Sequence, residues 1–146
     1  MELSASLEDY IETIYHIVEE KQVARAKNIA DQLSVSRASV TEALRALSSK
    51  GLINYAPYEV ITMTPLGKEV AEDVIFRHNT LKNFFTRILT IEQDIAEDGA
   101  CKIEHSAPPQ VIDRMIDFMK FVDSCPQVEK GLINKFRDFI KSKDHK

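Results

Sequence analysis

The sequence predicts a mostly α-helical protein built from two parts. Apolar residues recur at helical spacing along most of the 146 residues. Two short runs rich in β-branched residues interrupt this pattern, between Leu52 and Thr64. We therefore expect a first domain over residues 1–72, with helices and one β-hairpin, and an all-α second domain over residues 73–146.

Composition excludes several classes of protein. No run approaches the ~20 apolar residues that a membrane-spanning helix needs. The first residues lack the basic and apolar regions of a signal peptide. Cys101 and Cys125 are the two cysteines, too few for a disulfide framework. These features predict a cytoplasmic protein that does not enter a membrane.

The net charge of −4 conceals an asymmetry along the chain. Between Lys21 and Tyr55 there are six basic and two acidic residues, whereas between Glu92 and Asp123 there are three basic and eight acidic residues. The first segment favours an anionic partner and the second a cation. The overall negative charge argues against binding of nucleic acid over the whole surface.

Three helices are predicted in the first part of the chain. They are expected over residues 7–21, 27–33 and 37–50. Ser36 is placed to cap the third helix, and Gly51 to end it. Because the link between the second and third helices is short, these two form a helix-turn-helix pair.

The N-terminal end of the third helix carries small, polar and basic side chains on its outward face. Such residues suit insertion into the major groove of DNA, where they meet base edges and phosphates. The predicted DNA-binding residues are Lys27, Ser36, Arg37, Ala38, Ser39, Thr41 and Arg45. An ordinary helical hairpin with a solvated face would present similar residues, so this segment alone leaves both interpretations open.

A β-hairpin is expected directly after this helix pair. Residues 52–55 and 60–64 have the composition of two short strands, and Ala56-Pro57-Tyr58-Glu59 that of the turn between them. A helix-turn-helix followed at once by a hairpin predicts a winged helix-turn-helix, which binds double-stranded DNA.

The rest of the chain is predicted to be helical. Thr64-Pro65 opens a long helix as N-cap and first helical residue. Further helices are expected over residues 92–106, from Pro108 to Cys125, and at the C-terminal end. The expected inward positions are Leu66, Val70, Val74, His78, Leu81, Phe85 and Ile88 on the long helix, and Val111, Ile112, Met115, Phe118, Met119 and Val122 after Pro108.

The last two helices are strongly apolar for the end of a small chain. Leu132, Phe136, Phe139 and Ile140 recur at helical spacing on the final helix. With little else to cover them, these helices predict an interface between two chains. The alternative is that they fold back on the long helix.

Cys101, Glu104 and His105 share one face of one helical turn, because positions i, i+3 and i+4 are neighbours. A thiol, a carboxylate and an imidazole are all donors to divalent metals. Charged helix faces and buried cysteines are nevertheless common without a metal. The cluster is therefore a candidate metal site that needs further ligands.

Other parts of the chain offer such ligands. Asp9 and Glu12 share a polar face of the first helix, where acidic residues also stabilise a helix N-terminus. His78 occupies an inward position, which suits both a buried, hydrogen-bonded histidine and a metal ligand.

Four segments in order resemble one known family. They are Leu7-Glu8-Asp9-Tyr10-Ile11-Glu12, Ile29-Ala30-x-x-Leu33-x-Val35-Ser36, Thr64-Pro65-x-Gly67 and Cys101-x-x-Glu104-His105. Together they resemble the metal-dependent repressors typified by the diphtheria toxin repressor and the manganese transport regulator, and the likeness covers nearly the whole chain. The resemblance implies a homodimer, with an all-α dimerisation and metal-binding domain. It would bind palindromic DNA operators of metal uptake genes when loaded with Fe(II) or Mn(II).

The resemblance also implies metal ligands. The manganese branch implies Asp9, Glu12, His78, Glu104 and His105. The iron branch has a cysteine where Cys101 stands and a methionine where Asp9 stands, whereas the manganese branch has a glutamate at the position of Cys101. We count Cys101 as a ligand and expect an Fe(II)-responsive protein that also accepts Mn(II), because a thiolate favours softer ions.

The chain departs from the family pattern at several positions. Lys82 stands where the iron branch has a glutamate of its ancillary metal site, which argues against that site here. Glu59-Val60 replaces a basic residue and a glycine of the wing, and Glu42 replaces a lysine, so the operator sequence cannot be transferred. Family members often carry an additional SH3-like domain, which this chain is expected to lack.

Two other functions remain open at this stage. A winged-helix redox sensor would use Cys101 as a thiolate beside cations, but the acidic residues near it outnumber Lys102. A small metallohydrolase would use the same ligands, although no other segment predicts a substrate pocket or an oxyanion donor. The sequence thus favours a repressor that is not an enzyme and takes no small organic substrate.

Overall fold

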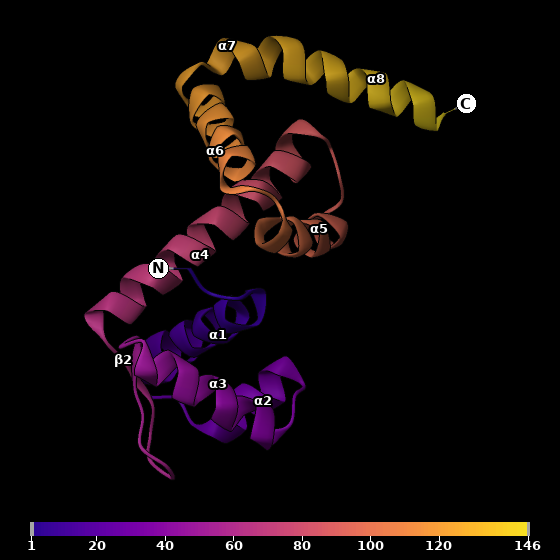
Figure 1. Cartoon of the computed structure of the whole chain (residues 1–146). Coiled ribbons are helices and arrows are strands. Elements are labelled where there is room, and N and C mark those ends of the chain that lie inside the picture. The colour runs from indigo at the N-terminus through magenta and orange to yellow at the C-terminus, as the bar shows by residue number, and fades with distance from the viewer. Residues whose placement is uncertain (1, 146) are drawn as a thin grey trace. The chain divides into compact units, whose positions relative to one another are not determined.

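The computed structural model describes residues 2–145 and shows a mostly helical chain with one short β-hairpin (Figure 1). The chain divides into two compact units, the first ending at Ile75 and the second beginning at Phe76. The sequence placed this boundary between residues 72 and 73. Within the described part of the chain, no helix is long and apolar enough to cross a membrane.

The first unit contains helices and the hairpin. Its elements are α1 (Ala5–Lys21), α2 (Ala26–Leu33), α3 (Arg37–Ser49), β1 (Ile53–Asn54), β2 (Thr62–Met63) and the first part of α4 (Pro65–Asn83). The strands are antiparallel, with Ile53 opposite Met63. They are shorter than predicted, and a bridge between Ala24 and Ile61, which was not predicted, extends the pairing.

Apolar side chains from the first three helices and the hairpin form one core in this unit. Buried members include Ile11, Ile14, Ile29, Val40, Leu44, Leu47, Leu52 and Ile61. The N-cap and the glycine stop predicted for α3 are confirmed, whereas α1 and α2 begin two residues and one residue earlier than predicted. Ser36 Oγ accepts a hydrogen bond from the Ser39 amide (3.1 Å) at the start of α3, and Gly51, with a φ of 74°, follows its end.

A close approach of two backbone segments fixes the start of α4. Thr64 Oγ1 donates to the Gly51 carbonyl (2.7 Å) and accepts from the Gly67 amide (3.0 Å), so the predicted N-cap is present. A Cβ atom on Gly67 would lie 1.8 Å from the carbonyl oxygen of Leu52. A side chain therefore does not fit at Gly67, which gives the Thr-Pro-x-Gly motif a physical reason.

The second unit is built from helices. After the end of α4 come the π-helical turn η1 (Phe84–Ile88), α5 (Gln93–Ser106), α6 (Pro109–Ser124), α7 (Pro126–Val128), the π-helical turn η2 (Glu129–Ile133) and α8 (Asn134–Asp144). In η1 the Leu89 amide donates to the carbonyl of Phe84, five residues earlier (3.2 Å). The buried apolar cluster of this unit is small and comprises Leu81, Phe85, Ala96, Ala100, Ile112 and Ile116.

Several side chains predicted to point inward are exposed. Leu66 on α4 and Val111 and Phe118 on α6 face solvent, whereas Ile116, which was not predicted, is buried. Apolar residues surround more of α6 than one face, so periodicity alone could not select the buried side. Leu132 of η2 is 71 % exposed.

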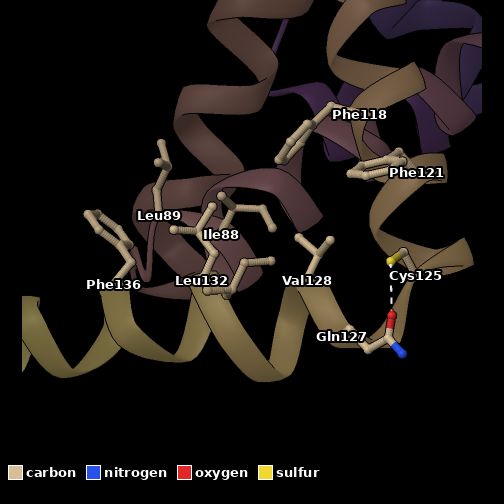
Figure 2. A pocket seen from close by; sticks show the side chains of 10 residues that line it. Ile88, Leu89, Phe118, Phe121, Cys125, Gln127, Val128, Leu132 and Phe136 are labelled. Carbon is tan, nitrogen blue, oxygen red and sulfur yellow. Dashed lines mark hydrogen bonds between the residues drawn. The ribbon is translucent and has the colours of Figure 1, made fainter.

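Phe118 and Leu132 border an apolar groove in the second unit, with a volume of about 730 Å³. Figure 2 shows Phe118 and Phe121 projecting from α6, Leu89 at the end of η1, and Leu132 and Phe136 on η2 and α8. Aromatic and aliphatic side chains of three segments thus converge on one open surface.

An arginine network ties the C-terminal helices to η1. Arg87 pairs with Asp123 of α6 (3.0 Å) and with Glu129 of η2 (3.4 Å). Arg137 of α8 donates to the Arg87 carbonyl (3.0 Å) and pairs with Glu129 (3.5 Å). Polar contacts therefore hold α8 to its own unit, while the apolar side chain of Phe139 on α8 remains exposed.

Candidate metal centre and nucleic-acid interface

A basic concavity lies between α3, the start of α2 and the hairpin. Its volume is about 430 Å³. It is lined by Arg25, Ala26, Lys27, Arg37, Thr41, Arg45, Tyr55, Pro57, Tyr58 and Glu59. Four basic side chains against one carboxylate make this surface suitable for an anionic partner.

The predicted DNA-binding residues divide into two groups. Lys27, Arg37, Thr41 and Arg45 line the concavity. The other three, at the exposed start of α3, are Ser36, Ala38 and Ser39. The two serine hydroxyls bond to each other, Ser36 Oγ donating to Ser39 Oγ at 2.9 Å, so Ser36 acts locally as a helix cap.

The predicted DNA-binding set did not include the other residues that line this concavity, among them Arg25, Tyr55 and Tyr58. Tyr58 lies in the turn between the strands, fully exposed and with a φ of 67°, a left-handed conformation that is strained for a tyrosine. The positive charge of Arg25, two residues before Lys27, could have placed it among the predicted DNA-binding residues. The sequence offers no comparable signal that Tyr58 is held outward.

The second unit brings four predicted metal ligands together. His78 on α4 is buried, and Cys101, Glu104 and His105 share one face of α5 as predicted. One donor atom of each of these three α5 residues lies within 4.8 Å of the others. His78 Nδ1 is 3.3 Å from Glu104 Oε1, and His105 Nε2 is 3.2 Å from the same oxygen.

The Glu104 carboxylate shows that this cluster fits a metal. Its side chain is 2 % exposed. Oε1 faces the two histidines, but Oε2 has no hydrogen-bond partner among residues 2–145. A buried carboxylate oxygen without a donor is costly. A divalent cation bound there would satisfy this oxygen, and the neighbouring imidazoles and thiol are donors that Fe(II) accepts.

Hydrogen bonding sets the charge of His78. The bond with the Glu104 carboxylate raises the pKa of His78 to about 9, although burial acts in the opposite direction. The imidazole is therefore protonated at neutral pH in the metal-free protein. It places a positive charge beside Glu104, and a bound cation would have to replace that charge.

Two lysines that bear on other interpretations are both paired. Lys82 Nζ lies 2.8 Å from Glu97 Oε2 and lowers the pKa of the Glu97 carboxyl. Lys102, the cation that a redox role of Cys101 would need, pairs with Asp98 (2.7 Å). Sequence reasoning gave Glu97 no role at the site, although it stands four residues before Cys101, on the same helical face.

The remaining predicted ligands, Asp9 and Glu12, lie on α1 in the first unit. Both are half-buried. Glu12 Oε1 lies 3.8 Å from Nε2 of the exposed His16. The i, i+3 spacing places the two carboxylates on one face of α1, as the sequence predicted.

Comparison with known proteins establishes the family. Residues 2–61 match the N-terminal DNA-binding domain of the iron-dependent repressors, and residues 64–132 match their metal-binding and dimerisation domain. The chain belongs to the iron-dependent repressor family. Its members are transcriptional regulators, and the resemblance inferred from the four sequence motifs is confirmed.

Individual relatives agree with this family. The transcriptional regulator MntR of Bacillus pumilus (strain SAFR-032) is 36 % identical over 122 residues, which are 84 % of each chain. The crystal structure of T. acidophilum IdeR has a TM-score of 0.66 and 26 % identity, over 77 % of this chain and 53 % of that one. A manganese-dependent transcriptional repressor complex with manganese has a TM-score of 0.69 and 25 % identity, over 79 % and 53 %. This chain thus spans about half the length of these two solved structures.

Proposed function

We propose that this chain is a metal-activated repressor of metal uptake genes, which binds palindromic operators in the cytoplasm and is not an enzyme. The observation that carries the proposal is the buried Glu104 carboxylate. Its Oε2 has no donor among the described residues, its Oε1 faces His78 and His105, and the Cys101 thiol lies nearby. Membership of a repressor family and the basic concavity of the first unit support a regulatory role for that site.

In this proposal six side chains hold the cation: Asp9, Glu12, His78, Cys101, Glu104 and His105. The grouping of four of them on α4 and α5 supports their part, and the family resemblance supports the two carboxylates of α1. When bound, the metal supplies positive charge that neutralises the carboxylates. Because of the Cys101 thiolate, Fe(II) is expected to bind more tightly than Mn(II), and both are expected to activate.

The proposed DNA-reading element is α3. Arg37 and Arg45 would reach base edges or phosphates in the major groove, and Lys27 and the missed Arg25 would contact the backbone. The basic concavity and the exposed start of α3 support this arrangement. Since these contacts are ionic, affinity for DNA is expected to fall steeply as salt rises.

The active form is proposed to be a homodimer joined through the second unit. The apolar groove of Figure 2 supports this, because Phe121 and Leu132 are exposed at its edge. Apolar patches on a small soluble chain commonly mark interfaces. A second copy packed by two-fold symmetry would cover the same groove on both chains. It would also present two α3 helices about 34 Å apart, the length of one DNA turn.

Ligands from both units would explain how the metal controls DNA binding. Asp9 and Glu12 belong to the unit that carries α3, whereas His78, Glu104 and His105 belong to the other unit. Without metal, the carboxylates repel one another. With metal, the two units would be restricted to one arrangement, and DNA binding would tighten only as far as the metal prefers that arrangement.

The test is Glu12→Gln in the 146-residue chain, with Glu20→Gln, an exposed change on the same helix, as the matched control. DNA selected for binding to the metal-loaded chain serves as the ligand in anaerobic fluorescence anisotropy. Parent and control are expected to bind it roughly 5–150-fold more tightly with Fe(II) or Mn(II). Glu12→Gln is expected to keep the parent's oligomeric mass and its weak metal-independent affinity for DNA. Its affinity is not expected to increase when Fe(II) or Mn(II) is added.

Two results would contradict the proposal. A full metal response in Glu12→Gln would exclude this carboxylate from the coupling. A parent chain that binds neither Fe(II) nor Mn(II) would overturn the metal-activated function itself.

A further inference from the structure

The two ring nitrogens of His78 have different carboxylate partners. Nδ1 lies 3.3 Å from Oε1 of Glu104, on the side of the proposed metal ligands. Nε2 lies 2.6 Å from Oε1 of Glu97, two turns before Glu104 on α5. The other oxygen of Glu97 lies 2.8 Å from the ammonium of Lys82, which stands one turn after His78 on α4. Glu97 therefore bridges an imidazole and an ammonium group, with one oxygen for each.

This arrangement determines which nitrogen can bind a metal. A metal binds the neutral imidazole, so the Nδ1 proton of the charged His78 ring has to leave first. The short contact with Glu97 keeps the remaining proton on Nε2, where it is donated to the carboxylate. The lone pair is then left on Nδ1, which faces Glu104. Metal-binding histidines commonly donate their second ring nitrogen to a carboxylate, which fixes the tautomer and the ring orientation.

The Lys82 ammonium has a separate part in the arrangement. The Glu97 side chain is 51 % exposed, so without a second contact it would be free to rotate away from the ring. The ion pair with Lys82 restrains it, because Lys82 lies one helical turn after His78 on α4 and holds the carboxylate near the ring. An exposed ion pair alone contributes little to stability. Here the pair contributes by orienting the Glu97 carboxylate toward His78.

We infer that Glu97, held by Lys82, is a positioning residue of the metal site that keeps the Nε2 proton of His78 and presents Nδ1 to the cation. The inference rests on the proposed function, since it takes the cation site for granted. It adds two residues that are not ligands themselves. Both oxygens of Glu97 are already used, one by His78 and one by Lys82.

The test measures binding of Co(II), a spectroscopic probe for such sites, by anaerobic titration of the 146-residue chain. Glu97→Ala is compared with Asp98→Ala, which removes the adjacent carboxylate of α5 and its exposed pair with Lys102. We expect Glu97→Ala to lose roughly 10–100-fold in Co(II) affinity and to change the d–d absorption bands. Asp98→Ala is expected to stay within about twofold, since exposed ion pairs contribute little.

Two further variants separate positioning from charge. Glu97→Gln still offers an oxygen to the Nε2 proton and is expected to recover part of the affinity that Glu97→Ala loses. Lys82→Ala leaves the carboxylate in place but unrestrained, and is expected to lose less than Glu97→Ala. In the Zn(II)-loaded chain, the Nε2 proton of His78 is expected to give an imidazole ¹⁵N–¹H signal that Asp98→Ala keeps and Glu97→Ala loses.

The outcomes separate this inference from the proposed function. A parent chain that binds no Co(II) overturns both. A parent that binds Co(II), together with a Glu97→Ala variant of unchanged affinity and spectrum, overturns the positioning role alone. Equal losses in Glu97→Ala and Asp98→Ala also overturn it, because they would reduce the effect to the loss of negative charge near the site.

Discussion

The two units complete their cores in different ways. The first buries a large apolar cluster from its helices and hairpin. The second buries a smaller cluster, and with it the polar residues His78 and Glu104. Its exposed large apolar residues are Phe76, Leu89, Ile95, Ile103, Val111, Phe118, Phe121, Leu132 and Phe139, against Val35, Tyr58, Val60 and Leu66 in the first unit.

This difference distinguishes a unit with few exposed large apolar side chains from one with many. The first unit leaves fewer large apolar side chains exposed, and its basic concavity is the surface proposed to bind DNA. The second keeps apolar side chains on its surface and an unsatisfied carboxylate oxygen inside. Both features are costly in a free chain. The proposed second copy and cation would remove both costs.

The largest expected difference in stability is between replacing one glycine in the first unit and one in the second by alanine. Gly67→Ala would place a Cβ against the Leu52 carbonyl and is expected to destabilise the first unit by more than about 4 kcal/mol. Gly131→Ala in η2 meets no atom within 4 Å and is expected to be neutral or to stabilise by about 0.5–1 kcal/mol, because alanine favours helix. Urea unfolding followed by circular dichroism measures both. Equal losses would contradict the comparison.

The next largest difference in stability is expected between the same substitution at a buried leucine and at an exposed leucine. Leu44 is 0 % exposed, and Leu44→Ala is expected to cost about 3 kcal/mol of unfolding free energy. Leu132→Ala is expected to change the stability of the single chain by less than about 0.5 kcal/mol, but to weaken self-association roughly tenfold. Sedimentation equilibrium measures the association. A Leu132→Ala chain that associates like the parent would remove this residue from the interface.

The smallest expected effect concerns helix caps. Ser36→Ala removes the hydroxyl that accepts from the Ser39 amide, and should cost about 1 kcal/mol. By contrast, α5 follows Glu92, which makes no side-chain cap bond. Glu92→Asp keeps the charge, supplies a capping carboxylate and is expected to stabilise the second unit by about 0.5–1 kcal/mol. Thermal unfolding of both variants tests this, and a loss in Glu92→Asp would contradict the expected cap.

The sequence predicts the first unit well because its signals are local. Ser36, Gly51 and Thr64 mark helix ends through bonds within a few residues, and the structure contains each of these bonds or turns. The cluster on α5 was also accessible, since helical spacing alone places Cys101, Glu104 and His105 on one face. Helical periodicity and capping residues are therefore enough to predict the helices and to group metal ligands that lie on the same helix.

Features that depend on packing between elements were not accessible in the same way. The contact of His78 with Glu97 joins residues on two helices, and no pattern within either helix shows it. The exposure of Phe118 and the burial of Ile116 depend on which side of α6 meets its neighbours. In each case the deciding information is the relative placement of two helices, which one sequence does not contain.

The π-helical turns affect how the helices of the second unit can accept a change in chain length. In η1 the hydrogen bond from Leu89 to Phe84 closes a ring one residue wider than in an α-helix. Such a turn accommodates a residue gained by insertion without opening a loop. We therefore expect the turns at Phe84–Ile88 and Glu129–Ile133 to accommodate single-residue length differences between relatives within helical segments of the second unit.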